Sequence, residues 1–215
     1  MIKLALIGQG GHAKVITDII YANKGYQIVA VFDDVHQSLH HNDGVLYGPI
    51  AAIHSLIEEI DFKIIIAIGS NEVRQRIAKQ LNLTEDSYET IIHPTAIVSN
   101  FSLVGSGTVI MPHVVVHANT TIGKHTIINT ASVIEHDNEI GDFVHISPNA
   151  TLTGMVSVGV GGHIGANATI IPMKKIGTWS IIGAGSTVIS NVPPFCTAVG
   201  SPAKVVKKNS YTRRM

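Results

Sequence analysis

An aliphatic residue recurs at every sixth position through the second half of the chain. The repeat runs without an insertion, and a small residue such as Ala, Ser or Thr often stands two places earlier. Every one of the repeat positions is Val, Ile or Leu: Val98, Val104, Ile110, Val116, Ile122, Ile128, Ile134, Ile140, Ile146, Leu152, Val158, Ile164, Ile170, Ile176, Ile182 and Val188. A period of six predicts a parallel β-helix, in which each hexad forms one short strand and one corner.

Three hexads make one triangular coil, so residues 18 apart should stack on one another. Glycine follows the aliphatic residue in every third hexad, at Gly105, Gly123, Gly141, Gly159 and Gly177. We expect this column to mark a corner whose backbone adopts a conformation that a Cβ atom would oppose. The superperiod independently predicts a triangular prism of about five coils, roughly 25 Å long at ~4.8 Å per coil.

The first 90 residues read as a small α/β unit. Apolar runs predict buried strands at residues 3–7, 27–32 and 63–68, and helical spacing predicts helices at 14–21, 50–60 and 70–81. This β-α-β-α-β-α order indicates a half-sized Rossmann-like unit with a parallel sheet, in which ligands bind beyond the carboxyl ends of the strands.

A glycine-rich turn follows the first predicted strand. Gly8-x-Gly10-x-x-Ala13 nearly matches a dinucleotide fingerprint, and Asp33 follows about 20 positions later. Glycines let backbone N–H groups approach a phosphate at a helix N-terminus. A whole dinucleotide normally needs two mononucleotide halves, and only one precedes the repeat. We therefore favour a nucleotide-linked small molecule, with Asp33 or Asp34 accepting hydrogen bonds from its ribose or base. NAD and a purely structural turn remain alternatives.

Composition excludes several classes of protein. The chain has 15 Lys and Arg against 15 Asp and Glu, which argues against a partner held by bulk charge, such as nucleic acid or an anionic membrane. The single cysteine, Cys196, cannot form an internal disulfide. The apolar run before Gly8 is too short for a signal peptide, and no stretch approaches the ~20 apolar residues of a membrane span. We expect a soluble cytoplasmic protein.

One hexad of the repeat carries a candidate general base. His136 lies off the interior position and is flanked by carboxylates in a part of the chain that is otherwise poor in charge. One coil further on stands Gly154, which would leave space beside the imidazole and expose a backbone N–H group. Transfer of an acyl group needs a base for the nucleophile and donors for the oxyanion.

Other histidines of the repeat are expected to have different roles. His145 and His163 are 18 apart and should form a ladder on one face, which is usually structural. A divalent metal between them is an alternative. His113, His117 and His125 are expected to be surface residues.

These features together resemble one known family. The N-terminal unit opens with Gly10-Gly11-His12, and the repeat carries Asn129-Thr130 and Glu135-His136-Asp137. Residues 66–74 and 199–204 fit as well. The chain is similar over essentially its whole length to the sialic-acid O-acetyltransferase-like (NeuD) family of hexapeptide-repeat acyltransferases. Within that family the match is closest to the N-acetyltransferases of bacillosamine-type nucleotide 4-amino sugars.

The resemblance implies a fold, an assembly and residue roles. It implies a left-handed β-helix in residues 93–215, with a C-terminal tail, after a Rossmann-like nucleotide-sugar-binding domain in residues 1–92. It also implies a homotrimer that uses acetyl-CoA and needs no metal. His136 would be the general base, and Asp137, where the best-known relatives have Glu, would raise its basicity. The cofactor contacts would be His145, Gly154, Ala166 and Ala184, and the nucleotide-sugar contacts would be Gly10, Gly11, His12, Asp33, Asp34 and Gly69.

We therefore expect an acetyl-CoA-dependent N-acetyltransferase that acts on a nucleotide-activated 4-amino-dideoxy sugar, with UDP as the expected nucleotide, in bacterial glycan or exopolysaccharide synthesis. O-Acetylation of a sugar hydroxyl, as in sialic acid, uses the same base and thioester and remains an alternative. A non-catalytic trimeric nucleotide-sugar-binding scaffold is another. A metalloprotein of the carbonic-anhydrase type would need three His ligands, and only His145 and His163 are aligned.

Overall fold

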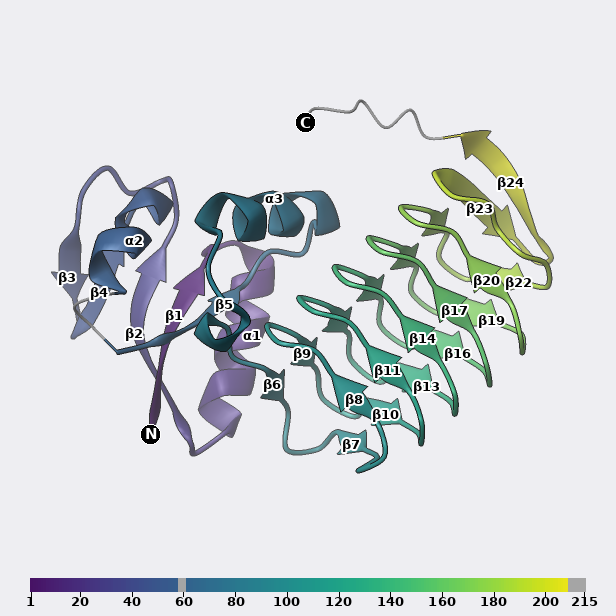
Figure 1. Ribbon diagram of the computed structural model, residues 1–215, viewed down its shortest axis with the longest axis horizontal. Coiled ribbons are helices and arrows are strands. Elements are labelled where there is room, and N and C mark those ends of the chain that lie inside the picture. Colours follow the sequence, from purple (N-terminus) through teal and green to yellow (C-terminus); the bar gives the residue numbers. More distant parts are fainter. Residues whose placement is uncertain (58–60, 209–215) are drawn as a thin grey trace.

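The computed structural model describes residues 1–57 and 61–208, which form an α/β unit followed by a long parallel β-helix (Figure 1). The α/β unit lies at the end of the β-helix where the repeat begins. The β-helix ends in an antiparallel hairpin that extends one of its sheets.

The α/β unit has a five-stranded sheet in the order β3-β4-β2-β1-β5. All neighbours pair in parallel except β3 and β4. The strands are β1 (Ile2–Ile7), β2 (Tyr26–Phe32), β3 (His40–Asn42), β4 (Val45–Gly48) and β5 (Lys63–Ile66). Helix α1 (Gly11–Ala22) packs on one face. The other face is covered by the 3-10 turn η1 (Ile50–Ala52), α2 (Ile53–Leu56) and α3 (Asn71–Leu81), and the turn η2 (Glu85–Ser87) follows.

The predicted strands and helices of this unit are confirmed with small shifts at their ends. The helix predicted at residues 50–60 consists of η1 and α2, and its last three residues lie outside the described residues. The β3–β4 hairpin was not predicted from the sequence. Its two-residue loop is Asp43-Gly44, both with positive φ, which is the preferred chemistry of a tight hairpin turn.

The β-helix is a triangular prism of the left-handed hexapeptide type, as predicted. Its three sheets hold strands that recur every 18 residues in parallel register. The six-stranded sheet contains β7 (Ile97–Val98), β10 (Val115–Val116), β13 (Val133–Ile134), β16 (Thr151–Leu152), β19 (Thr169–Ile170) and β22 (Thr187–Val188). The five-stranded sheet of the prism contains β8 (Leu103–Val104), β11 (Thr121–Ile122), β14 (Glu139–Ile140), β17 (Ser157–Val158) and β20 (Lys175–Ile176).

The third side of the prism is an eight-stranded sheet. It contains β6 (Ile91–Ile92), β9 (Val109–Ile110), β12 (Ile127–Ile128), β15 (His145–Ile146), β18 (His163–Ile164), β21 (Ile181–Ile182), β23 (Cys196–Gly200) and β24 (Ala203–Lys208). The expected domain boundary between residues 92 and 93 falls directly after β6 and stays a prediction.

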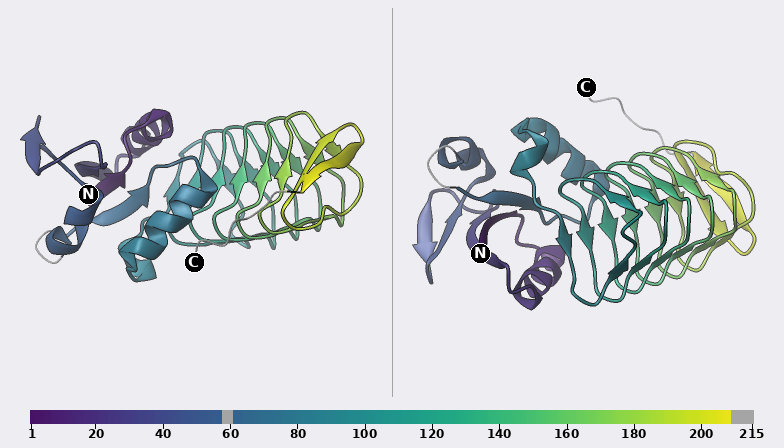
Figure 2. Two further views of the ribbon diagram at one scale, coloured as in Figure 1. Left: turned by 90° about the horizontal axis from the view of Figure 1, so that it is seen from above. Right: turned by 60° about the horizontal axis from the view of Figure 1, so that its bottom comes forward.

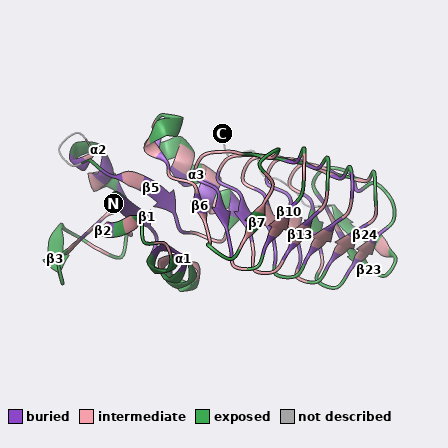
Figure 3. Ribbon diagram, turned by 90° about the horizontal axis from the view of Figure 1, so that it is seen from below, coloured by how far each residue is buried: buried purple, intermediate pink, exposed green. Residues whose placement is uncertain are grey.

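The repeated aliphatic side chains fill the interior of the prism. Ile110, Ile128, Ile146, Ile164 and Ile182 are fully buried in one such column. Figure 3 shows buried residues along the strands and exposed residues on the outer side of α1. Burying a side chain of this size stabilises the fold by about 1.5–3 kcal/mol, so the stacked columns are the main source of stability.

The glycine column has a different cause from the one expected. None of Gly105, Gly123, Gly141, Gly159 and Gly177 has a positive φ. A Cβ atom on Gly123 would instead lie 2.5 Å from the backbone nitrogen of Asp142, in the next coil. Positive φ occurs two residues after each glycine of the column, for example at His125 and Phe143. The glycines are needed because successive coils approach too closely at this corner for any side chain.

Helix α3 lies against the first coils of the prism (Figure 2). Its Arg74 side chain joins the α/β unit to the prism. Arg74 is only 1% exposed, and its guanidinium group has no carboxylate partner among the described residues. It donates instead to the carbonyl oxygens of Ile68, Gly69, His125, Phe143 and Val144 and to Oδ1 of Asn71. The Asn71 amide continues the contact by donating to the carbonyls of Gly161 and Gly162. One side chain therefore bonds to two successive coils of the prism.

Replacing this side chain should uncouple the two parts of the molecule. In Arg74→Met several buried carbonyls lose their donor, and each unpaired buried group costs about 1–3 kcal/mol. We expect the free energy of unfolding to fall by on the order of 3 kcal/mol, measured by urea denaturation. The control is Arg76→Met, whose side chain is exposed on the same helix and should change stability by less than about 0.5 kcal/mol. Equal losses in both variants would contradict the assigned role of Arg74.

Candidate functional site

His136 and Asp137 lie together at the corner between β13 and β14, which we call the third corner. The His136 Nδ1 and Asp137 Oδ2 atoms are 2.7 Å apart, and both side chains are about half exposed. Hydrogen bonds from His136 and from Asn119 lower the pKa of Asp137, so its carboxylate is ionised near neutral pH. An ionised carboxylate only accepts, so the proton of the neutral imidazole lies on Nδ1 and the lone pair on Nε2.

Gly154 stands one coil beyond His136, directly beside the imidazole. A Cβ atom on Gly154 would lie 2.6 Å from both Cε1 and Nε2 of His136. Any other residue would displace the ring. The spacing of 18 therefore places the two residues together as the sequence indicated, and the imidazole edge that carries the lone pair faces the glycine.

The glycine-rich turn after β1 is held by the aspartates that follow β2. The backbone N–H of Gln9 donates to Asp33 Oδ2 at 2.9 Å, and the other oxygen of Asp33 accepts from Val35 N–H. Asp34 Oδ1 accepts from Ile50 N–H at 3.1 Å. The aspartates thus shape the turn itself. Gly10 is the N-cap of α1, and the space beside the Cα atoms of Gly10 and Gly11 is open. The first turn of α1 can therefore approach a phosphate.

His12 belongs to this turn and lies near the prism. Its ring centroid is 6.3 Å from that of His145, on the eight-stranded sheet, and its Cβ atom would contact a side chain at Gly69 at 3.9 Å. His145 and His163 are paired in register with ring centroids 5.0 Å apart, so the predicted ladder is confirmed. His12, Gly69 and His145 therefore meet where the α/β unit covers the eight-stranded sheet.

Asn129 is a polar partner of His145 that the sequence analysis did not single out for this role. Its Oδ1 accepts from the backbone N–H of Thr130 at 2.8 Å, which leaves its amide nitrogen 3.1 Å from His145 Nε2. The amide nitrogen can only donate, so Nε2 accepts and the proton of His145 lies on Nδ1. The repeat could have indicated this contact. Ile128 pairs with Ile146 in the next coil, so Asn129, directly after Ile128, lies close to His145, directly before Ile146.

The other two expected cofactor residues lie on a different edge. Ala166 and Ala184 follow β18 and β21 on successive coils, at the corner where the chain leaves the eight-stranded sheet. The Ala166 carbonyl accepts from Gly185 N–H at 2.8 Å. His145 is thus on one side of the prism, Ala166 is at that side's edge, and His136 is at the corner opposite that side. One chain does not bring these residues into a single pocket.

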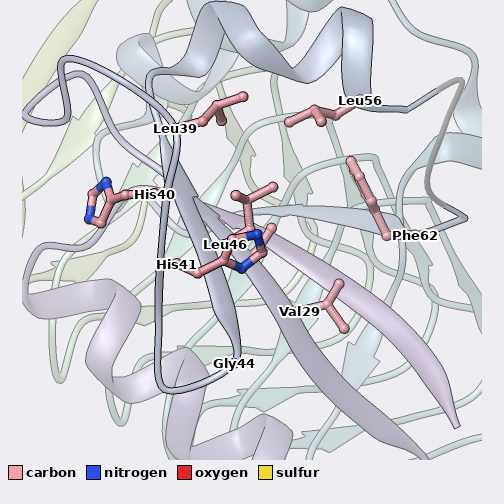
Figure 4. Close-up of a pocket in the computed structure, with 9 residues that line it drawn as sticks. Val29, Leu39, His40, His41, Gly44, Leu46, Leu56 and Phe62 are labelled. Atoms are coloured by element: carbon pink, nitrogen blue, oxygen red, sulfur yellow. The ribbon is translucent and has the colours of Figure 1, made fainter.

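An apolar hollow of the α/β unit lies elsewhere. It has a volume of about 440 Å³ and lies between β2, the β3–β4 hairpin and α2 (Figure 4). Its lining residues are Val29, Ala30, Leu39, His40, His41, Gly44, Leu46, Leu56 and Phe62, and none of the expected site residues is among them. Within residues 1–57 and 61–208, no three His, Cys, Asp or Glu side chains are grouped so that they could hold a metal ion. The same residues include no helix long and apolar enough to cross a bilayer.

His125 is a correction to the sequence analysis, which expected it at the surface. It is 6% exposed, stacked on Phe143 with ring centroids 5.1 Å apart, and edge-on to Tyr88 at 4.5 Å. The segment after α3 covers this corner of the prism, and a hexad repeat does not record which corner another segment covers.

The chain is similar to several proteins of known activity. The PglD N-terminal domain family matches residues 3–81. The UDP-N-acetylbacillosamine N-acetyltransferase of Bacillus subtilis (strain 168) is 45% identical over 109 residues, which cover 50% of each chain. The matched segment therefore spans about half the length of that curated relative.

Two solved structures match almost the whole chain. PerB from Caulobacter crescentus, in complex with CoA and GDP-perosamine, is 34% identical with a TM-score of 0.87, covering 95% of this chain and 97% of its own. The acetyltransferase domain of PglB from Neisseria gonorrhoeae, in complex with acetyl coenzyme A, is 34% identical with a TM-score of 0.85, covering 95% and 98%.

One buried and two partly buried histidines make the free energy of unfolding depend on pH. Burial, with a smaller contribution from Arg74, lowers the pKa of His12 and His125 to about 4, and burial, His163 and Arg74 lower that of His145 to about 3. The unfolded chain therefore binds more protons below its own histidine pKa of about 6.5. Stability should be complete above pH 6.5 and fall as the pH decreases, by about 1.4 kcal/mol per pH unit for each histidine.

Urea denaturation at pH 7.5 and 5.5 measures this loss. We expect a smaller loss of unfolding free energy in His125→Phe, because this variant lacks one histidine whose pKa is lowered by folding. Phenylalanine fits the position, since Phe143 has the same left-handed backbone one coil further on. His54→Gln, at an exposed histidine, is the control and should lose as much stability as the wild type. An unchanged pH dependence in His125→Phe would show that His125 is not held neutral.

Proposed function

The chain belongs to the hexapeptide-repeat sugar N-acetyltransferases with a PglD-type N-terminal domain, and on that premise we propose that it transfers the acetyl group of acetyl-CoA to the amine of a nucleotide-linked amino sugar. The relatives that support this are an N-acetyltransferase for UDP-N-acetylbacillosamine and a protein solved with CoA and GDP-perosamine. The observation that carries the proposal for this chain is the His136–Asp137 pair beside Gly154.

His136 is the proposed general base. Asp137 accepts from Nδ1–H, so Nε2 is free to take a proton from the sugar amine as it attacks the thioester. General-base assistance of this kind contributes about 10²–10⁴-fold to the rate.

The co-substrate is proposed to bind along the prism. Gly154 leaves room for the His136 imidazole, the acetyl group would lie beside that ring near Nε2, and a backbone N–H there would stabilise the oxyanion. His145, Gly154, Ala166 and Ala184 would contact acetyl-CoA. The two alanines would do so through backbone groups, for which a small side chain gives access.

The nucleotide sugar is proposed to bind at the carboxyl ends of β1, β2 and β5. The first turn of α1, at Gly10 and Gly11, would meet the phosphates. His12, Asp33, Asp34 and Gly69 would contact the remainder of the nucleotide sugar. We take the sugar to be a 4-amino-dideoxy sugar linked to UDP, used in bacterial glycan or exopolysaccharide synthesis.

The active site is proposed to form between copies of the chain in a homotrimer. His12 and His145 meet on one side of the prism, whereas His136 is at the opposite corner. A neighbouring prism could bring its third corner to the His12–His145 side, and a closed cyclic assembly satisfies this contact for every copy. The cytoplasm is the proposed location, because acetyl-CoA and nucleotide sugars are charged and do not cross a bilayer.

Release of free thiol from acetyl-CoA tests the function. The acceptors are a UDP-4-amino-4,6-dideoxy sugar, GDP-perosamine and free sialic acid. We expect rapid release with one nucleotide amino sugar, and a fall of ~10²-fold or more in kcat in His136→Asn. His113→Asn is the control, because His113 is an exposed residue on another corner of the same prism.

The outcomes separate the alternatives. Release with sialic acid alone would move the enzyme to hydroxyl acetylation with the same base. Release that His136→Asn leaves unchanged would exclude His136 as the base. Binding of nucleotide sugar without any thiol release would favour the scaffold.

A further inference from the structure

Asp137 is bound from two directions. Its Oδ2 accepts from His136, and its Oδ1 lies 3.2 Å from the amide nitrogen of Asn119, one coil before it. Both Asn119 and Asp137 have left-handed backbones, with φ of 60° and 57°, so their side chains leave the third corner in the same direction. Both oxygens of the exposed carboxylate therefore have a protein partner.

Asn119 is the polar neighbour of Asp137 within its own column. The other residues at this position of the corner are the exposed, apolar Phe101, Met155 and Met173. These side chains offer the carboxylate no hydrogen bond. An aspartate is short and half exposed here, so its carboxylate could turn toward water if only the imidazole held it.

We propose that Asn119 is a positioning residue for the reaction, which holds the Asp137 carboxylate on His136 Nδ1 and so keeps the Nε2 lone pair toward the substrate. The expected effect of Asn119 on the reaction rate rests on the proposed function. The arrangement of the three side chains itself is independent of that function and can be tested without a substrate.

The variant that tests this is Asn119→Gly. Glycine keeps the left-handed backbone without strain and removes only the amide. Asn82→Gly is the matched control, because Asn82 is an exposed asparagine with a left-handed backbone, φ 44°, at the end of α3 and outside the prism. With the acceptor identified above, we expect kcat to fall about fivefold in Asn119→Gly, the effect of one hydrogen bond, while KM for both substrates and Tm match the control.

A second substitution separates positioning from a structural effect. In Asp137→Glu the longer side chain can contact the imidazole without help from Asn119. Asn119→Gly should therefore reduce kcat less in that background than in the wild type. Equal reductions in the two backgrounds would show that Asn119 does not act through Asp137.

Nitrogen-15 NMR of the imidazole distinguishes failure of this inference from failure of the proposed function. In the wild type we expect the neutral ring of His136, assigned with His136→Asn, to carry its proton on Nδ1. In Asn119→Gly both tautomers should be populated. An unchanged tautomer would overturn the role of Asn119 even in an active enzyme, whereas a changed tautomer in a chain that transfers no acetyl group would leave it standing and reject the function.

Discussion

Stacking of residues 18 apart determines both the shape of the prism and the positions of its candidate functional side chains. Each coil bonds to the next through backbone hydrogen bonds in parallel register, and the inward aliphatic side chains leave no alternative register that keeps them buried. The same spacing places His136 beside Gly154, His145 beside His163 and Asn119 beside Asp137. The candidate chemistry is therefore built from the contact that also holds the prism together.

The second constraint is the attachment of the α/β unit through Arg74. A guanidinium group without a carboxylate partner is costly to bury, and here carbonyl oxygens of the prism and of the loop before α3 compensate that cost. These acceptors are fixed by the backbone, so they accept the group in one arrangement only. The contact places the glycine-rich turn and His12 against the eight-stranded sheet, where a nucleotide sugar would be held at a defined distance from the prism.

The division of the candidate site over the edges of the prism has a physical reason. A filled, close-packed interior separates the His145 side from the His136 corner, so a ligand cannot reach both within one chain. A rigid prism with groups on opposite edges suits a cyclic assembly, in which each neighbour supplies the missing edge. In the proposed function the assembly therefore completes the active site in addition to stabilising the fold.

The repeat allowed the prism, its 18-residue stacking and the His136–Gly154 neighbourhood to be predicted, because a strict period converts sequence separation directly into spatial contact. The strands of the α/β unit and the glycine-rich turn followed from local patterns of the same kind. The burial of His125 and the role of Arg74 could not be predicted in this way. Both depend on which corner of the prism α3 and the segment after it cover. The contacts along the repeat follow from the sequence alone, whereas the contacts across it depend on the tertiary structure, because docking between the two parts follows no period.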